Sequence, residues 1–357
     1  MKIRSALFGA TGAALVLGGV MAANPAVSQV NTVKQIGPGV YFHEGDLKGN
    51  GHCNNGWIIF EDYVLVVDAN FPSGAKVIIP KIQELTQKPI RFAFDTHHHG
   101  DHAYANRVWV EQGAVPVGHV GVLKEMKKYE SGLYGNKPGR WEDAAKTRKD
   151  VAESRLQPPT LLFPDSMIFD DGKLRVELKH FGVAHTHGDG WAWLPKERIL
   201  FSGDACVNGP YNYVGDGNIS QWIQTLAAAR KLNPKWVVPG HGPMADGGLL
   251  ADQQKYFLTL QTAGQRLLKT HPRPAAAQAQ VATIKARILK DAQIQRYVGD
   301  FFEAQLGKAY EEAGGKAFPN KRASADDHDR HASLHAAPLR RLGAPSTWRA
   351  RLARQSR

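Results

Sequence analysis

Cysteine and long apolar runs are both scarce in this chain. Its 357 residues include two cysteines, Cys53 and Cys206, which permit one disulfide in an oxidising compartment but leave open whether it forms. Beyond residue 30 no stretch is apolar for long enough to cross a bilayer. Internal repeats are absent as well. These absences exclude a protein with several membrane spans and give no sign of a repeat architecture.

Clustered positive charge is missing from the middle of the chain, although the formal net charge is +12. The residues from 319 onward contribute +6, from nine Lys or Arg against three Asp, and Lys2 and Arg4 contribute +2, which leaves +4 for the residues between. A nucleic-acid surface should combine basic and aromatic residues within the fold. We therefore expect a mildly basic globular protein with a small-molecule substrate and no nucleic-acid partner.

The first residues have the features of a targeting signal. MKIR is a short basic start, ALFGATGAALVLGGVMAA is apolar, and ANPAVSQ offers small residues for cleavage. Residues 1–28 are therefore predicted to be a signal peptide cut after Ser28. With no twin arginine and no lipobox-type cysteine, we expect export through the general secretion route to the periplasm or beyond, metal loading after translocation, and no membrane association of the mature protein. An uncleaved single-span anchor is the alternative.

Apolar periodicity divides the rest of the chain into three parts. From 30 to 248, strand-like runs such as GWIIFEDYVLVVDAN and PIRFAFDT alternate with helix-like runs such as SGAKVIIPKIQELTQ, which favours an α/β sheet. Within this part, the polar segment from about 127 to 159 is predicted to be helical and to form one wall or lid of a cleft. Residues 249–318 are predicted to form a helical extension, and residues 319–357 a disordered basic tail.

Four histidines and two aspartates occupy the eight positions from Asp95 to His102. Alternate side chains of an extended segment point the same way, so His97 and His99 can share one metal ion. Gly100 permits a turn, after which Asp101 and His102 can face a second metal beside the first. Imidazole and carboxylate ligands suit zinc, and also iron or manganese. A metal-free surface cluster is disfavoured because similar residues follow at other strand ends.

Three further ligand-type residues stand where an apolar strand gives way to a turn containing glycine. They are His185 in VAHTHGDGW, Asp204 in ILFSGDA and His241 in VVPGHG. An α/β sheet presents its functional groups at such strand ends. The complete set supplies one metal with His97, His99 and His185, and the other with Asp101, His102 and His241, while the two oxygens of Asp204 bridge them.

The motifs HHHGDH, AHTHGD, FSGD and VVPGHG follow the order of the metal motifs in the metallo-β-lactamase superfamily, which the chain resembles from about residue 35 to 245. The resemblance implies an αββα sandwich, two β-sheets packed face to face with helices outside, and a site for two zinc ions along one edge. It also implies that His185 is the ligand in HTH. His187 is then expected beside the site or facing solvent.

Such a site implies hydrolysis without a side-chain nucleophile. A water bridging two cations is hydroxide near neutral pH and attacks a carbonyl or phosphoryl centre. Asp101 is the candidate catalytic residue, because its carboxylate can hold the hydroxide and later carry a proton. Asp68, at the end of VLVVD, either orients a histidine ligand or has a capping or purely structural role.

The motifs say less about the substrate than about the metal ligands. RILFSGD, GDGNISQW and PKWVVPGHG are similar in layout to zinc β-lactamases, but many of those have cysteine where this chain has Asp204, and a substrate-binding lysine where it has Val207. Aspartate at that position resembles the glyoxalase II type of thioester hydrolase, although export argues against glutathione thioesters. We expect an exported hydrolase of an ester, amide, lactone or lactam, with a β-lactamase proper as the alternative.

Other functional classes share the fold or the charge. Iron-dependent oxidoreductases, such as persulfide dioxygenases, need one iron with an open position, whereas seven ligands favour two metals. A flavodiiron protein would need a flavodoxin-like domain, which does not follow. A nuclease fits the net charge but not its location in the two ends, and a non-catalytic metal-binding protein remains as the least specific interpretation. About two zinc per chain would support hydrolysis, and one iron would support dioxygen chemistry.

Several other residues have two interpretations each. His119 in PVGHV is expected to be a packed or hydrogen-bonded histidine rather than a cleft residue. Tyr211, Asn212 and Tyr213 follow Asp204 closely enough to contact substrate, but they are offset from the substrate-binding asparagine of the family. The loop GDLKGNGHCNNG resembles the mobile flap of β-lactamases, and a hairpin turn explains the same composition.

Overall fold

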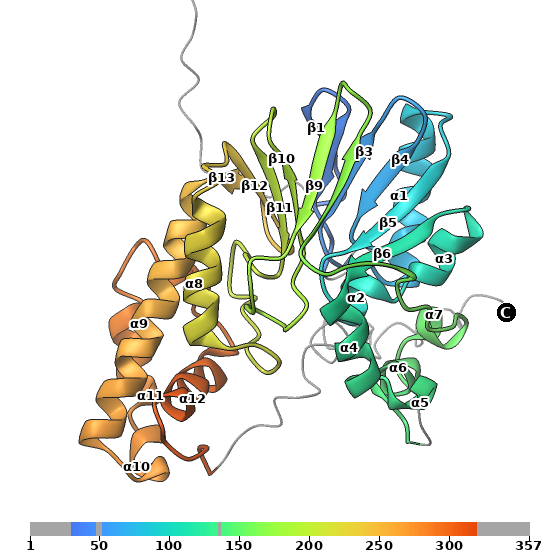
Figure 1. Ribbon diagram of the computed structural model, residues 1–357. Helices are drawn as coiled ribbons and strands as arrows, with labels where there is room; N and C mark the ends of the chain where they lie inside the picture. The colour runs from blue at the N-terminus through green and yellow to red at the C-terminus, as the bar shows by residue number, and fades with distance from the viewer. Residues whose placement is uncertain (1–29, 48–51, 135–136, 320–357) are drawn as a thin grey trace, which may run out of the picture.

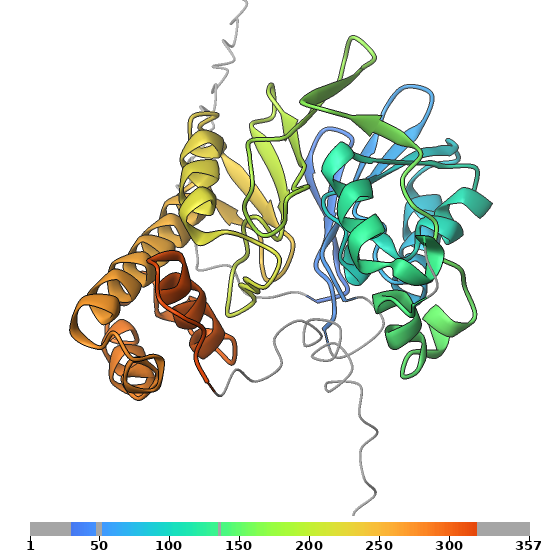
Figure 2. The same ribbon diagram turned by 60° about the horizontal axis from the view of Figure 1, so that its bottom comes forward.

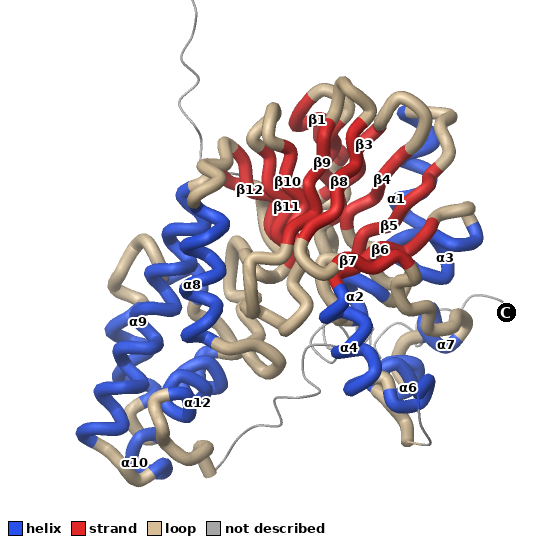
Figure 3. Tube along the Cα trace, viewed as in Figure 1, coloured by secondary structure: helices blue, strands red, loops and turns tan. Residues whose placement is uncertain are grey.

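The computed structural model describes residues 30–47, 52–134 and 137–319. The predicted signal peptide and the predicted tail beyond Pro319 lie outside the described residues. Two β-sheets form the centre of the described structure, and helices flank both of them (Figure 1). Figure 3 shows the strands together in the middle and the helices at the two sides.

The first sheet has seven strands that lie in sequence order. Its first four strands pair antiparallel, and the pairs from the fourth strand to the seventh are parallel. The strands are β1 (Val33–Gly37), β2 (Val40–His43), β3 (Asn55–Ile59), β4 (Val64–Val67), β5 (Ile90–Asp95), β6 (Val115–His119) and β7 (Leu161–Phe163).

The second sheet has six strands in the order β13-β12-β11-β10-β9-β8. All its neighbours are antiparallel except β11 and β12, which are parallel. The strands are β8 (Ser166–Asp170), β9 (Arg175–Lys179), β10 (Trp191–Leu194), β11 (Ile199–Gly203), β12 (Trp236–Pro239) and β13 (Ala245–Asp246).

The two sheets pack face to face over a shared apolar core. Side chains that alternate along the strands meet there, as expected when one face of each strand points inward. The ring of Phe201 on β11 lies so close to Gly56 on β3 that a Cβ at position 56 would stand 2.1 Å from it. The buried members of this core include Val40, Phe42, Ile58, Leu65, Phe94, Val176, Leu178, Ala192, Leu194 and Phe201.

Helices cover the outer face of the first sheet. In α1 (Pro72–Leu85) the buried residues Ala75, Ile78, Ile79 and Ile82 recur at helical spacing and pack on the sheet. The neighbouring α3 (Asn106–Glu111) contributes Trp109 to the same cluster. The short helices α2 (Gly100–Ala103), α4 (Val120–Tyr129), α5 (Ser131–Tyr134), α6 (Arg140–Ala145) and α7 (Lys149–Ala152) follow along the chain.

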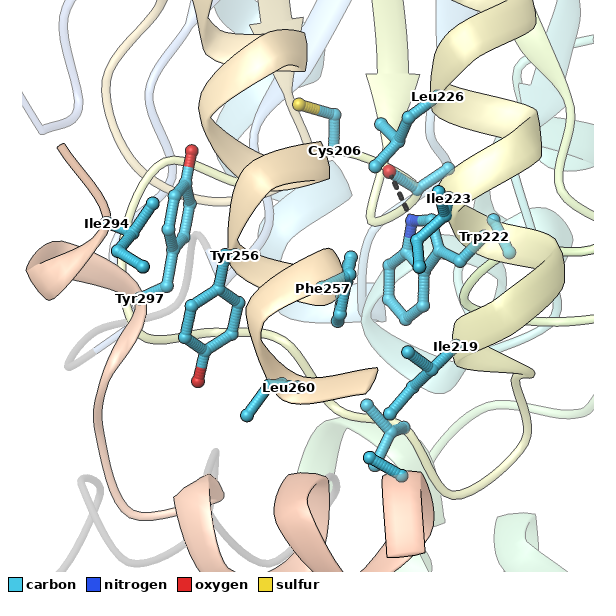
Figure 4. Close-up of a cluster of buried hydrophobic side chains, with 14 of the residues drawn as sticks. Cys206, Ile219, Trp222, Ile223, Leu226, Tyr256, Phe257, Leu260, Ile294 and Tyr297 are labelled. Carbon is cyan, nitrogen blue, oxygen red and sulfur yellow. Dashed lines mark hydrogen bonds between the residues drawn. The ribbon is translucent and has the colours of Figure 1, made fainter. Parts of the chain in front are cut away.

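The outer face of the second sheet is covered by α8 (Ile219–Arg230) and α9 (Gly248–Thr270). Trp222 of α8 lies against Phe257 of α9 with ring centroids 4.4 Å apart, and its indole Nε1 donates to the backbone oxygen of Ala205 at 2.8 Å (Figure 4). The same core continues into α10 (Pro274–Gln278), α11 (Val281–Ile288), the 3-10 helix η1 (Gln295–Tyr297) and α12 (Phe302–Glu312). Figure 2 shows these C-terminal helices gathered beside the second sheet.

The expected αββα sandwich with C-terminal helices is confirmed. The sequence interpretation did not include β1, β7 and β13, which have five, three and two residues. Cys53 and Cys206 are both buried free thiols, so the disulfide that the sequence left open does not form in this structure. Among the described residues, no helix combines the length and apolarity needed to cross a membrane.

Candidate metal centre

The seven residues predicted as metal ligands come together from both sheets. They stand in the connections after β5, β9, β11 and β12, and all seven side chains are buried. His97 and His99 form the turn after β5, and α2 carries the next two residues. The full set is His97, His99, Asp101, His102, His185, Asp204 and His241.

Three histidines form the first group. One ring nitrogen each from His97, His99 and His185 lies within 4.8 Å of the other two. The closest approach is 2.8 Å, between Nδ1 of His99 and Nε2 of His185. Three nitrogen atoms at this separation match a site in which each imidazole offers one lone pair to a shared ion.

The outward-facing nitrogens fix the tautomers of His99 and His185. Nδ1 of His185 lies 2.9 Å from the backbone oxygen of Tyr213, which only accepts, so this nitrogen carries the proton. Nε2 of His99 lies 2.8 Å from a carboxylate oxygen of Asp216 and carries the proton for the same reason. In the neutral rings two lone pairs therefore face each other at 2.8 Å, an arrangement that a cation between them stabilises.

His97 is oriented in the same way by a hydroxyl group. Oγ1 of Thr96 donates to Oδ1 of Asp68 at 2.7 Å and lies 3.1 Å from Nδ1 of His97, so it accepts the proton of that nitrogen. The buried Nε2 of His97 has no hydrogen-bond partner within the described part of the chain. Burial lowers the pKa of His97 well below its usual value, and neighbouring imidazoles lower it further, so the ring is neutral. Its free lone pair suits a metal ion.

Asp101, His102 and His241 form the second group, again within 4.8 Å. Nε2 of His241 lies 3.1 Å from Oδ2 of Asp101, and Nε2 of His102 lies 3.5 Å from the same oxygen. Asp204 stands between the groups: its oxygens are 3.4 Å from His102 and His241 and 3.7 Å from His185. A Cβ at Gly240 would come within 2.0 Å of Oδ1 of Asp204, so only glycine leaves room for this carboxylate.

The buried carboxylates of the second group favour positive charge beside them. Burial alone would lower the pKa of His241, but the Asp204 charge and hydrogen bonds to Asp101 and Asp204 outweigh it and raise the pKa to about 9. The pKa of Asp204 is held well below its usual value, against the effect of burial, by His241 and His102. Two buried carboxylates thus require positive charge nearby, which metal ions supply as well as protons do.

Asp68 has the orienting role that was one of its two predicted interpretations. It adopts the left-handed conformation, with φ 66°, directly after β4. Its Oδ1 accepts from the backbone nitrogen and hydroxyl of Thr96, and its Oδ2 lies 3.0 Å from Nδ1 of His102. One carboxylate therefore directs histidines of both groups.

Asp216 and Arg140 were not identified from the sequence. Besides His99, the buried Asp216 binds Arg140 through both guanidinium nitrogens, at 2.7 and 3.1 Å, and Arg140 stacks over Tyr129 at 3.7 Å. Although burial opposes it, hydrogen bonds from His98, His99 and Arg140 lower the pKa of Asp216. The only available signal was the position of Asp216 within GDGNISQW, and no spacing pointed to Arg140.

Other predicted positions are placed clearly. His187 is exposed, in agreement with a solvent-facing residue. His119 is a packed histidine, as expected: Nδ1 accepts from the backbone of Gly121, Nε2 donates to Pro164 and the ring stacks on His180 at 3.9 Å. The segment from about 127 to 159 contains the helices α5, α6 and α7, as predicted.

The loop between β2 and β3 is described in part, because residues 48–51 lie outside the described residues. Because β2 and β3 pair antiparallel, the loop connects a β-hairpin, and its second half is anchored. The side chain of Asn54 donates to the backbone oxygens of Pro239 and Gly242 at 2.8 and 2.7 Å, which connects the loop to the end of β12. His52 and Cys53, which precede Asn54 in the loop, are also buried.

The tyrosines after Asp204 lie beside candidate ligands. The ring of Tyr211 is 5.6 Å from that of His241, and the ring of Tyr213 is 5.7 Å from that of His99. The side chain of Asn212 is fully buried. Contact with substrate stays a prediction for all three residues.

Comparison with known proteins identifies relatives of this chain. The metallo-beta-lactamase type 2 of Bacillus sp. (strain 170) is 26% identical over 230 residues, which are 61% of this chain and 79% of that protein. The enzyme of the same name from Bacillus cereus is 25% identical over 228 residues, with the same shares.

Solved structures are similar in fold. The metallo-beta-lactamase from Pontibacter korlensis superposes with a TM-score of 0.51 at 18% identity, over 64% of this chain and 98% of that one. VMB-1 superposes with a TM-score of 0.52 at 21% identity, over 65% and 99%. Residues 49–241, more than half of the chain, match the sequence profile of the metallo-beta-lactamase superfamily, and the chain therefore belongs to that superfamily.

Proposed function

We propose that this protein is an exported hydrolase that uses two metal ions, zinc in the first instance, to cleave an ester, amide, lactone or lactam bond of a small molecule. The first metal position is formed by His97, His99 and His185, and the second by Asp101, His102 and His241, with Asp204 shared. The observation that carries the proposal is the 2.8 Å approach of Nδ1 of His99 to Nε2 of His185, with an acceptor oxygen beside the other ring nitrogen of each histidine.

The donor set fits this chemistry. Divalent ions held by these residues would supply a water that ionises near neutral pH and an electrophile for the carbonyl oxygen of the substrate. We assign Asp101, whose Oδ2 lies 3.1 Å from Nε2 of His241, the role of holding a proton and passing it to the leaving group. Thr96, Asp68 and Asp216 keep the imidazoles in the tautomers that point lone pairs inward.

A β-lactamase proper is the second candidate, because the relatives that share 25–26% identity carry that name. The residues around the site favour a different substrate. Val207, at the position of the lysine that grips the β-lactam carboxylate in related enzymes, is buried completely. The nearby guanidinium groups of Arg140 and Arg148 are engaged with Asp216 and Asp150. A charge-assisted hydrogen bond is worth about 1.5–3 kcal/mol, so β-lactam binding is expected to be weak.

Metal analysis and a substrate panel test the proposal together. The purified protein should contain about two zinc ions per chain, whereas one iron per chain would indicate the oxidoreductase chemistry of the same fold. The panel should include β-lactams, lactones, thioesters and phosphodiesters, each with wild type and His97→Ala. We expect an activated ester or lactone to be hydrolysed faster than nitrocefin or a carbapenem, and His97→Ala to abolish that activity. Rapid β-lactam turnover, near ~10⁶ M⁻¹s⁻¹ in kcat/KM, would reverse this ranking.

Export is part of the proposal and rests on the composition of residues 1–28. The mature protein is expected in the periplasm or medium with its N-terminus directly after Ser28. Sequencing the N-terminus of protein recovered from those fractions checks this point, and an intact Met1 in membrane fractions would support the uncleaved anchor instead.

A further inference from the structure

A buried amide of the C-terminal helices contacts the loop beside the candidate metal centre. Gln305 of α12 is fully buried, and its Nε2 donates to the backbone oxygen of Asn212 at 2.6 Å. Its Oε1 accepts from the hydroxyl of Tyr256 on α9. Both ends of the Gln305 amide are thus used, and one of them holds the loop that follows β11.

That loop carries the group that orients a candidate ligand. Tyr213, the residue after Asn212, accepts the Nδ1 proton of His185 with its backbone oxygen at 2.9 Å. The ring of Tyr213 lies between the ring of His99, 5.7 Å away, and the ring of Phe301, which precedes α12, at 5.9 Å. A shift of this short stretch therefore moves the carbonyl that sets the tautomer of His185.

The far end of the loop is held by the same helix. The carboxylate of Glu312, the last residue of α12, accepts from the backbone nitrogens of Ile219 and Ser220 at 2.8 and 2.9 Å, at the beginning of α8. Just before this point, Asn218 donates to the backbone oxygen of Ala184, the neighbour of His185, at 3.2 Å. Helix α12 thus anchors residues 212 to 220 at both ends.

We propose that the C-terminal helical extension is a positioning element for the metal centre, with Gln305 as the positioning residue that holds the Tyr213 carbonyl against His185. The inference rests on the proposed function in one respect, that His185 is a metal ligand. The profile of the superfamily ends at residue 241, before this extension begins. The anchoring of the loop by α12 is accordingly a feature of this chain that the family assignment does not supply.

The physical reason is tautomer control. A neutral imidazole carries one proton, and if the acceptor at Nδ1 is lost, the proton can occupy Nε2, where the lone pair for the metal must be. Partners behind a ligand change metal affinity by roughly 10- to 100-fold when they are removed. Gln305 acts one step further from the metal, so we expect its loss to lower metal affinity about 10-fold.

The test compares two variants of the full-length protein. One removes both hydrogen bonds of the Gln305 amide, and the other removes one of them. Gln305→Met removes both bonds at similar side-chain length. Tyr256→Phe removes only the bond inside the extension and leaves the one to Asn212. Zinc affinity is measured by competition with a chromophoric chelator, and backbone hydrogen exchange of residues 211–218 is measured in metal-free protein.

We expect Gln305→Met to bind zinc about 10-fold more weakly and to exchange its loop amides about tenfold faster. Tyr256→Phe should stay within about twofold of wild type in both measurements. Equal zinc affinities and equal loop exchange in the two variants would overturn the inference. Should Gln305→Met fail to fold, Phe301→Leu at a half-buried position is expected to change both quantities in the same direction, and no change there would also overturn it.

The two proposals fail in different ways. If the wild-type protein binds no zinc, the proposed function is wrong. The exchange comparison needs no metal, so it still shows whether Gln305 holds residues 211–218. If zinc binds with high affinity but Gln305→Met changes neither quantity, the proposed function stands and the positioning role is wrong.

Discussion

Asp204→Asn gives the sharpest test of a centre with two metals, because it keeps the shape of the side chain and removes its charge. Asp204 is buried, and its oxygens lie 3.4 Å from Nε2 of His102 and of His241, and 3.7 Å from Nε2 of His185. The carboxylate is therefore within reach of both ligand groups. We expect both metal ions to bind more weakly, rather than only one of them.

The size of the effect follows from the burial of the charge. Removing one partner of a buried ion pair costs about 3–5 kcal/mol. Because asparagine retains one carbonyl oxygen as a ligand, we expect the lower end of this range, about 3 kcal/mol, which corresponds to roughly 150-fold in affinity. Zinc content after dialysis, affinity from chelator competition and the rate of substrate hydrolysis should all fall together.

Asp95→Asn is the matched control. Asp95 is another fully buried aspartate, at the end of β5, and its Oδ2 accepts from Nδ2 of Asn106 at 2.6 Å. Burial raises the pKa of Asp95 well above its usual value, which disfavours a charge there. The substitution to asparagine makes the same chemical change at a buried residue outside both ligand groups, and zinc affinity should stay within about twofold of wild type.

Two results would refute this reasoning. One is an Asp204→Asn protein that retains about two zinc ions with wild-type affinity, because Asp204 would then not be shared between the metals. The other is an equal loss of zinc in Asp204→Asn and Asp95→Asn, because the effect would then come from disturbed packing rather than from charge.

Four further outcomes are expected. Burial lowers the pKa of His119 from 6.5 to about 4, so the wild-type protein loses stability as the pH falls through that range. His119→Asn keeps an acceptor for the backbone of Gly121. In urea unfolding, this variant should lose less stability than wild type between pH 7 and 5. Thr96→Val removes the acceptor of the His97 proton and should lower zinc affinity about 10-fold in chelator competition. Chelation should lower the melting temperature in calorimetry, since free zinc at 100 times its Kd adds about 2.7 kcal/mol. Deletion of residues 320–357, which carry no candidate ligand, should leave zinc content and melting temperature unchanged.

The sequence was sufficient to predict the fold class and the set of candidate ligands. Short apolar runs in alternation predicted an α/β sheet, and the resemblance to the superfamily implied the αββα sandwich. His, Asp and Gly at the ends of those runs predicted the edge where the candidate ligands meet. Both signals are local, since each depends on residues within about ten positions of one another. Strands β7 and β13 have too few residues to show a period, and the apolar residues Val33 and Ile36 of β1 do not alternate, so all three strands were missed.

The groups that orient the ligands were harder to predict, because they are not local. Asp216 is 117 positions from His99, and it is joined there by Arg140 from a different segment. The partner of His185 is the backbone oxygen of Tyr213, and every residue has such an oxygen. Side-chain type can reveal a ligand, but only the fold shows which acceptor stands behind it.

The position of Val207 links the helical extension to the question of substrate. Val207 lies three residues after Asp204, is fully buried, and its backbone nitrogen donates to Oε1 of Gln253 on α9 at 2.8 Å. Nε2 of the same glutamine donates to the backbone oxygen of Ala205 at 3.1 Å. The stretch that holds the substrate-binding lysine in related lactamases is therefore tied to the extension here. A lysine in that place would have to bury its charge, so under the proposed function we expect the substrate to contact other residues of the loops around the candidate metal centre.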